Sequence, residues 1–170
     1  MYKSAYGYDN QTIFYFDKVG NKYVASGGSL AWRINNPGLV KSRSHVALKN
    51  GAIGCYEGYA IFSNPKQGRN ALTELLHSKK YLSSTLNTVA GLYNLNDRGA
   101  FLNELCQSYP FSRTKKLSKF SDEEFSDLFF NLEKICGYKE LGNERFEVLP
   151  KILAHIEDVS KKRRLLFNCS

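Results

Sequence analysis

The chain has 170 residues, 42% of them hydrophobic, so it can bury a core as one domain without a disulfide framework or a structural metal. Its formal net charge of +8 favours an anionic partner, such as a nucleic acid, a membrane face or the acidic polymers of a bacterial envelope. Its 4 cysteines form no C-x-x-C pair and have no histidine at zinc-finger spacing, so we expect neither a metal nor a cofactor.

The first 28 residues predict a β-hairpin. Thr12 to Phe16 is β-branched and aromatic, residues 17–21 supply a turn, and Lys22 to Ala25 returns as the second strand. Gly27-Gly28 then lets the chain change direction. We expect this hairpin to cover one side of the core without taking part in chemistry.

Glycine, asparagine and aromatic residues crowd the stretch from Ser29 to Leu76, which has no simple helical or strand period. It consists of three pieces: AWRINNPG (31–38), NGAIGCYEGYAIF (50–62) and NPKQG (64–68). Pro37 and Gly38 indicate a turn, because proline fixes φ and glycine accepts the positive φ that follows. Where glycines bracket short apolar runs, the backbone bends or closely approaches another group; these are Gly51, Gly54 and Gly58. The pattern favours a surface with a cleft.

As a string, this stretch resembles a family found in phage virion-associated lysins and in toxin modules of bacterial contractile (type VI) secretion systems. The shared features are the Trp-Arg-Ile-Asn-Asn-Pro-Gly motif, a Gly-Ala-Ile-Gly segment and a Gly-aromatic-Ala-Ile-Phe strand followed by a helix. The resemblance extends over Gly27 to Gly137. It implies a lysozyme-like fold and degradation of peptidoglycan.

Four helices are predicted after the motif. Asn64 and Pro65 supply the N-cap and first residue of a helix that ends near Ser78. Two short helices follow, one over residues 85–93 and one capped by Asn96-Asp97. The fourth begins with a capping box at Ser121 and Glu124 and ends at Gly137.

From Phe146 onward the pattern indicates strands, and residues 151–156 and 164–167 could pair as a hairpin. We therefore predict an α+β protein with a helical centre and small β-hairpins at the N- and C-terminal ends. One domain spans residues 1–170, divided into the hairpin (1–28), the motif region with the helical core (29–137) and a C-terminal extension (138–170).

Hydrolysis of a glycosidic bond needs a carboxylic acid that protonates the leaving oxygen, and commonly a second carboxylate. Glu57 is the candidate acid, because partial burial among uncharged residues would raise its pKa. An exposed glutamate in a hairpin turn is the other interpretation. Asp97 is the candidate second carboxylate, in the part that resembles the family's Glu-Asn-Asp segment, although it could also be a helix N-cap.

Sugar binding needs aromatic faces for pyranose rings and amides for hydroxyl and acetamido groups. The predicted substrate-binding residues are Trp32, Arg33, Asn35, Asn36 and Tyr59. Two alternatives stay open: the single tryptophan could belong to the core, and the asparagines could hold the turn before Pro37.

Two other functions are compatible with the chain. A cysteine-dependent peptidoglycan peptidase or amidase would need a thiolate activated by histidine, and Cys55 with His45 or His155 could supply it. A non-enzymatic module could instead bind cell wall or nucleic acid through the basic run at residues 161–164.

The N-terminal residues show no classical signal peptide and no run is long enough to span a membrane. We expect synthesis in the cytoplasm without membrane insertion, delivery by a specialised secretion system or a virion, and action in the periplasm or cell wall of a target cell. The expected partners are peptidoglycan, an inhibitory immunity protein, and a structural protein of the secretion system or virion.

Overall fold

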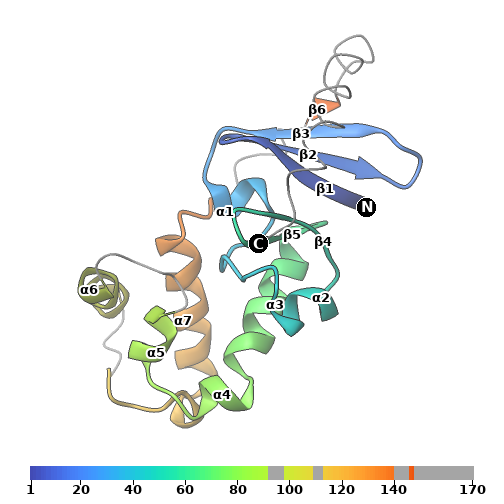
Figure 1. Ribbon diagram of the computed structural model, residues 1–170. Coiled ribbons are helices and arrows are strands. Elements are labelled where there is room, and N and C mark those ends of the chain that lie inside the picture. Colours follow the sequence, from blue (N-terminus) through green and yellow to red (C-terminus); the bar gives the residue numbers. More distant parts are fainter. Residues whose placement is uncertain (92–97, 109–112, 140–145, 148–170) are drawn as a thin grey trace.

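The computed structural model describes residues 1–91, 98–108, 113–139 and 146–147, and it confirms an α+β protein (Figure 1). Its strands are β1 (Tyr2–Asp9), β2 (Thr12–Asp17), β3 (Lys22–Ser26), β4 (Ala52–Tyr56), β5 (Tyr59–Phe62) and β6 (Phe146–Glu147). Its helices are α1 (Leu30–Arg33), α2 (His45–Lys49), α3 (Pro65–Leu76), α4 (Lys79–Leu82), α5 (Leu86–Ala90), α6 (Arg98–Ser108), the 3-10 helix η2 (Leu117–Lys119) and α7 (Asp122–Ile135).

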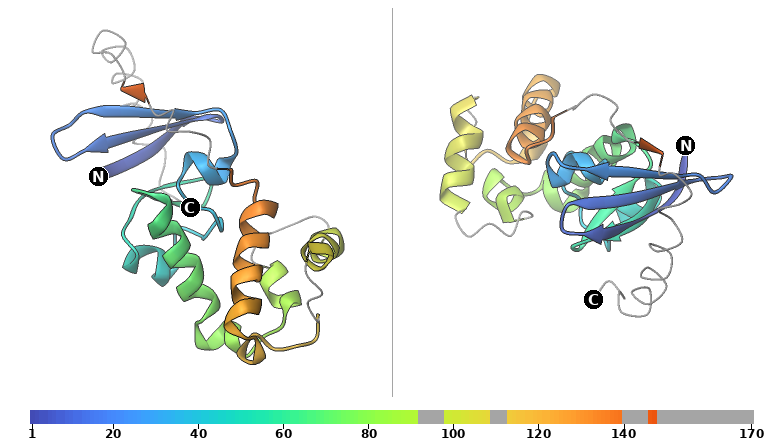
Figure 2. Two further views of the ribbon diagram at one scale, coloured as in Figure 1. Left: turned by 180° about the vertical axis from the view of Figure 1, so that it is seen from behind. Right: turned by 90° about the horizontal axis from the view of Figure 1, so that it is seen from above.

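A sheet occupies one end of the molecule and most helices the other, with β4 and β5 between them (Figure 1, Figure 2). The strand order in this sheet is β1-β2-β3-β6, and all neighbours are antiparallel. The hairpin predicted over residues 12–25 is confirmed as β2 and β3. β1 was not predicted, because it places small residues such as Ala5 and Gly7 on the inner face and Tyr6 on the outer one. The usual alternation of large apolar inner residues with polar outer ones in a half-buried strand is therefore not visible in the sequence of β1.

Two glycines allow β4 to lie directly on β1. A Cβ atom at Gly54 would be 2.0 Å from the carbonyl oxygen of Ala5, and a Cβ atom at Gly7 would be 1.9 Å from the ring of Tyr56. Real Cβ contacts are not this short, so any larger residue would separate the two strands. The close backbone approach predicted for Gly54 is thus confirmed.

Helix α3 begins as predicted. The Asn64 side-chain oxygen accepts a hydrogen bond from the backbone N–H of Gln67 at 3.1 Å, and Pro65 is the first helical residue. The helix ends at Leu76, close to the predicted end. Its predicted apolar stripe is buried at Ala71, Leu72 and Leu76.

The capping box predicted for the last long helix is present at the start of α7. Ser121 Oγ accepts from the backbone N–H of Glu124 at 3.2 Å, and the Glu124 carboxylate accepts from the backbone N–H of Ser121 at 2.7 Å. Gly137 follows the helix with φ of 72°, as expected for a C′ residue. Helices α5 and α6 lie where the pattern predicted them.

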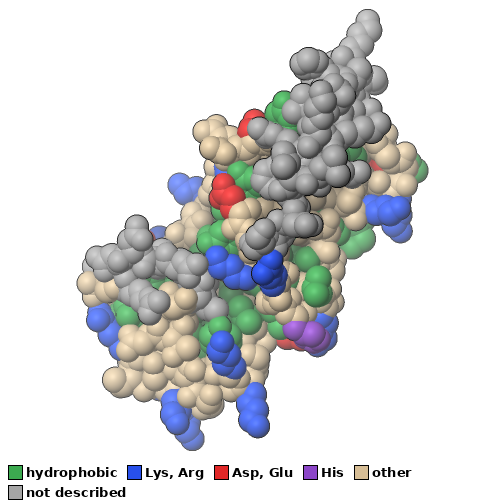
Figure 3. All heavy atoms as spheres, viewed as in Figure 1, with side chains coloured by type: hydrophobic (Ala, Val, Ile, Leu, Met, Phe, Trp, Pro, Cys, Tyr) green, Lys and Arg blue, Asp and Glu red, His purple; other side chains and the backbone are tan. Residues whose placement is uncertain are grey.

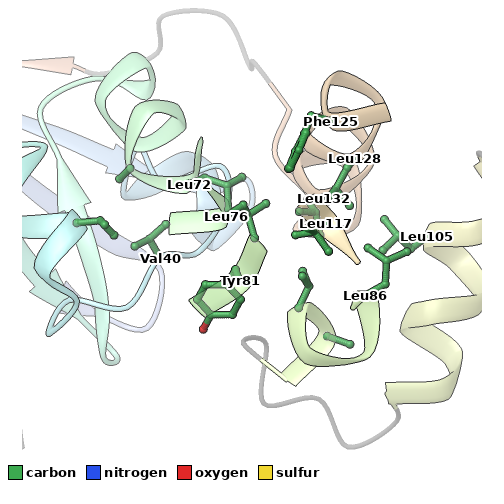
Figure 4. Close-up of a cluster of buried hydrophobic side chains, with 14 of the residues drawn as sticks. Val40, Leu72, Leu76, Tyr81, Leu86, Leu105, Leu117, Phe125, Leu128 and Leu132 are labelled. Carbon is green, nitrogen blue, oxygen red and sulfur yellow. The ribbon is translucent and has the colours of Figure 1, made fainter. Parts of the chain in front are cut away.

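Two hydrophobic clusters hold the fold together. One packs the helices against each other, and Figure 4 shows Leu72 and Leu76 of α3 facing Phe125 and Leu132 of α7. The other fills the space between the sheet and the β4–β5 hairpin; its buried members include Ile13, Tyr15, Trp32, Ile34 and Ile61. A bidentate ion pair between Arg69 and Glu133, at 2.9 and 3.1 Å, also joins α3 to α7.

The predicted C-terminal hairpin over residues 151–156 and 164–167 lies outside the described residues, as do Asp97, His155 and the basic run at 161–164. Within the described part of the chain, no helix has the length and apolar character needed to cross a bilayer.

Candidate functional site at the β4–β5 turn

Trp32 belongs to the core. Ser29 caps the short helix α1 by accepting from the backbone N–H of Trp32 at 3.2 Å, which turns this segment inward. The Trp32 side chain is only 5% exposed and packs in the cluster beneath the sheet. It therefore offers no face to a sugar, and its predicted place in a groove is wrong.

Asn35 and Asn36 are fully buried, and their side-chain amides form hydrogen bonds with backbone groups. Asn35 Nδ2 donates to the carbonyl oxygen of Phe62 at 2.9 Å. Asn36 Nδ2 donates to the carbonyl oxygens of Val40 and Ala60, and its Oδ1 accepts from the backbone N–H of Val40, each at 2.9 Å. Their predicted position on a sugar-binding surface is wrong, and the alternative that they hold the turn is confirmed.

The turn after the asparagines differs from expectation in its backbone. Positive φ falls on Asn35 (53°) and Leu39 (48°) and not on Gly38. Gly38 is required for a different reason, because a Cβ atom there would lie 2.6 Å from the Leu72 side chain. The Asn-Asn-Pro-Gly motif is therefore a packing element between the β4–β5 hairpin and α3.

Glu57 lies at the turn between β4 and β5, and its side chain is exposed. The predicted partial burial is wrong, and the exposed-turn interpretation is confirmed. Glu57 and Gly58 have φ of 49° and 77°, the pattern of a type I′ hairpin turn. Asparagine or glycine adopts this left-handed conformation readily, whereas glutamate does so at a cost. Glu57 is thus a strained residue on the surface.

Tyr56 connects this turn to the end of β1. Its hydroxyl donates to the backbone carbonyl oxygen of Asp9 at 2.9 Å. Burial, and then hydrogen bonding to Glu57 and the charge of Glu57, raise the pKa of Tyr56; the charge of Asp9 acts in the same direction. Tyr56 therefore links the Glu57 turn to the end of β1 at Asp9, whose carboxylate accepts from the backbone N–H of Gln11 at 2.8 Å.

Tyr59 is directly opposite Tyr56 in the hairpin, and residue Lys41 pairs with Tyr59 on its other side. Directly paired residues share a face of a sheet, so Tyr56, Tyr59 and Lys41 form a row across three chain segments. Lys41 Nζ lies 3.8 Å from the centre of the Tyr59 ring. Of the predicted substrate-binding residues, Tyr59 alone lies beside Glu57 and is not buried in the core.

The Arg33 guanidinium lies beneath this region and is 7% exposed. It donates to three backbone carbonyl oxygens, those of Gly27, Gly28 and Asn10, at distances of 2.8 to 3.3 Å. Its Nε atom has no hydrogen-bond partner. These bonds join the chain between β3 and α1 to the β1–β2 turn, so Arg33 is placed for a structural role and its predicted contact with substrate is wrong.

Cys55 cannot act as a thiolate nucleophile in this state, because it is disulfide-bonded. Cys106, in the helical part of the fold, is a free cysteine. His77 caps the end of α3, where its ring stacks on Phe125 at 4.3 Å. The described residues contain no group of three or more potential metal ligands.

Three members of this site were missed from the sequence: Asp9, Tyr56 and Lys41. Asp9 and Tyr56 are 47 residues apart, and only the packing of β4 on β1 brings them together. No local pattern could have indicated this pair. The clearest available signal was the Tyr-Glu-Gly-Tyr run, which fits a two-residue hairpin turn with Tyr56 and Tyr59 as its flanking pair.

Comparisons of the chain with models of protein families, with curated proteins and with solved structures gave no match.

Proposed function

We propose that the protein is a peptidoglycan-degrading toxin or lysin with a lysozyme-like fold, and that it cuts the glycan strand as a muramidase does. The sequence resemblance over residues 27–137 supports the target. The strained, left-handed backbone of Glu57 is the observation that carries the proposal. Unfavourable backbone conformations at polar residues concentrate at functional sites, where the activity compensates for the lost stability.

Glu57 is the proton donor in this proposal. Glu57 is exposed in the free protein, so the glycan itself must cover the turn and exclude water. Removal of water favours the neutral, protonated carboxyl group, which can then donate to the glycosidic oxygen. In this proposal the exposed edge of Tyr59, which is partly buried beside the turn, contacts the sugar that is being cut.

Asp9 is the second carboxylate. It lies at the end of β1, where the carbonyl oxygen of the same residue accepts the Tyr56 hydroxyl. A carboxylate in this position can take a proton from the water that adds to the sugar, or can stabilise the sugar cation. Asp97, predicted from the sequence for this role, remains a prediction because it lies outside the described residues.

The proposal includes delivery and protection. A protein that cuts the cell wall acts in the periplasm or wall of a target cell, carried there by a secretion machine or a virion. The producing cell then needs an inhibitory protein, and the exposed turn at Glu57 is the surface that such a protein would cover.

A binding module without catalysis is the second candidate, favoured by the net charge of +8. On the face shown in Figure 3, Lys and Arg side chains are spread over the surface and do not gather in one patch. A spread of this kind suits weak attraction to an extended anionic polymer.

The test is digestion of purified peptidoglycan, with products identified by mass spectrometry. A muramidase releases reducing sugar ends, a peptidase or amidase releases new amines, and a binding module releases neither. We expect reducing ends with the wild type, and a loss of at least about 100-fold in Glu57→Gln. Asp9→Asn should also lower the rate.

Glu104→Gln is the matched control, because Glu104 is an exposed glutamate on α6 in the helical region. It should retain full activity. Full activity in Glu57→Gln would remove Glu57 from the mechanism, and intact peptidoglycan after treatment with the wild type would contradict the proposed function itself.

A further inference from the structure

Lys41 is a cation held in place without an anionic partner. Among the described residues, no carboxylate lies within ion-pair distance of it, whereas Lys49 and Lys115 contact Glu74 and Glu124 at 2.5 and 2.6 Å. The Nζ atom of Lys41 instead lies over the ring of Tyr59, 3.8 Å from its centroid. The corresponding distance for Lys80 over Tyr81 is 5.3 Å. Of these two lysines, Lys41 therefore lies closer to its aromatic ring.

The position of Lys41 is fixed by backbone bonds to the hairpin that carries Glu57. Ser42, the next residue, donates its backbone N–H to the carbonyl oxygen of Gly58 at 3.0 Å. Val40, the preceding residue, accepts from the backbone N–H of Ala60 at 2.9 Å. The segment from Val40 to Ser42 thus runs along the edge of β5 that does not pair with β4. Lys41 directly precedes Ser42, the residue that binds Gly58 in the Glu57–Gly58 turn.

A cation fixed on the hairpin that carries a candidate catalytic acid, and not neutralised by any described residue, is suited to a negatively charged ligand group. Lysine is a compact point charge that makes charge-assisted hydrogen bonds to carboxylates. The Tyr59 ring beneath it excludes water from one side, which strengthens such a bond. Arg33 cannot serve, because its guanidinium is buried and bound to backbone carbonyls.

We propose that Lys41, seated on Tyr59, is a carboxylate-binding subsite that makes the protein select acidic glycan over neutral glycan of the same length. This inference rests on the proposed action on peptidoglycan and goes further by naming the recognised group. Peptidoglycan offers carboxylates of two kinds: that of the acidic sugar, which is free only where no peptide is amide-bonded to it, and those of the attached peptide. The chemistry at Lys41 is the same for both, so the experiment must distinguish them.

Binding is measured by calorimetry with Glu57→Gln, which keeps the ligands intact. The probes are a neutral N-acetylglucosamine oligomer, a glycan strand of equal length with free sugar carboxylates, and the same strand with its attached peptides. We expect about tenfold tighter binding of an acidic strand than of the neutral one. If the sugar carboxylate is recognised, only the strand without peptides binds more tightly than the neutral one, because an attached peptide converts that carboxylate into an amide. If a peptide carboxylate is recognised, only the strand with peptides binds more tightly.

Lys41→Met keeps the apolar stem of the side chain and removes the charge, and it should reduce the preference to about onefold while neutral binding stays the same. Lys41→Arg should restore part of the preference, and thermal melting checks that both variants are folded. Lys18→Met is the matched control, because Lys18 is exposed in the β2–β3 turn, at the far end of the strand from the β1–β2 turn.

Three other outcomes would contradict the subsite. Equal binding of acidic and neutral strands by folded Glu57→Gln protein that retains Lys41 overturns the subsite while leaving the proposed function standing. An acidic preference that survives in Lys41→Met also overturns it. Binding of none of the three strands would contradict both the subsite and the proposed function, and the digestion assay then shows separately whether cleavage occurs.

Discussion

The backbone of Gly68 lies against the backbone of Asn35: a Cβ atom at Gly68 would be 2.3 Å from the Asn35 carbonyl oxygen and 2.8 Å from Cδ of Pro37. The Asn-Asn-Pro-Gly motif and the Asn-Pro-Lys-Gln-Gly motif, far apart in the chain, are therefore two halves of one packing contact. This contact seats the first residues of α3 on the turn and fixes the hairpin beside it.

Replacement of Gly68 by alanine should force α3 away from this turn. Overpacking against backbone atoms cannot be relieved by a rotamer change, so we expect a loss of about 1–3 kcal/mol in the free energy of unfolding. Urea denaturation measures it. Gly91→Ala is the control, because no atom of the described residues lies within 4 Å of a Cβ at that position and its φ is negative. Equal stability of the two variants would show that the close approach is absent in solution.

Asn36→Ala should destabilise the protein without a direct effect on ligand binding. The change removes three hydrogen bonds and takes away the partner of the Val40 backbone N–H and of the Ala60 carbonyl oxygen, whereas the Val40 carbonyl oxygen keeps the backbone N–H of Ala60. We expect a loss of about 1–3 kcal/mol or more in the free energy of unfolding. Asn70→Ala, at an exposed position on α3, should change it by less than about 0.5 kcal/mol. Normal stability with lost peptidoglycan binding would instead support the sugar-binding role predicted from the sequence.

Glu57→Asn should make the protein more stable and less active. Asparagine accepts the left-handed conformation that glutamate adopts at a cost, so we expect a gain of about 0.5–1 kcal/mol in the free energy of unfolding. Glu104→Asn, within helix α6, should give no gain because asparagine is the poorer helix former. The comparison requires urea curves for both variants and the digestion assay. A Glu57→Asn protein no more stable than wild type would contradict the assignment of strain.

Acid should destabilise the protein through carboxylates that the fold holds ionised. Hydrogen bonding by Lys115, and then by the backbone N–H of Ser121, holds the pKa of Glu124 below its ordinary value. Lys49 and then Asn50 do the same for the pKa of Glu74.

For each of these carboxylates the folded pKa is the lower one. The stability it contributes is present above the unfolded pKa of about 4.3, and it is lost as pH falls through the folded pKa. Urea midpoints measured between about pH 6 and pH 3 should therefore fall at the acid end. Glu124→Gln should flatten part of this fall, and Glu104→Gln should not. Identical pH profiles for Glu124→Gln and wild type would refute the contribution.

Local rules predicted the elements whose partners are close in sequence. The capping box of Ser121 and Glu124 and the start of α3 at Asn64 and Pro65 each involve residues within four positions of one another. The physics that decides them is contained in that short window. The β2–β3 hairpin was predictable for the same reason.

The site was less predictable because it depends on which way side chains turn. Asn35 and Asn36 have the chemistry of sugar ligands, and only the distant carbonyls of Phe62 and Ala60 determine that they face inward. For Glu57, burial could not be derived from uncharged neighbours, because a two-residue turn exposes its central residues whatever flanks them. Residue type indicated possible chemistry, and tertiary packing determined access.

The partnership of β3 with β6 has a consequence for biosynthesis. β3 ends at Ser26 and β6 begins at Phe146, so about 120 residues must be translated before this outer strand can dock. At ribosomal rates of about 5–20 residues per second, that interval is about 6–24 s. During this time the unpaired rim of the nascent sheet is open to pairing with other chains, so crowded expression should favour inclusion bodies, and slower induction at lower temperature should favour recovery of native material.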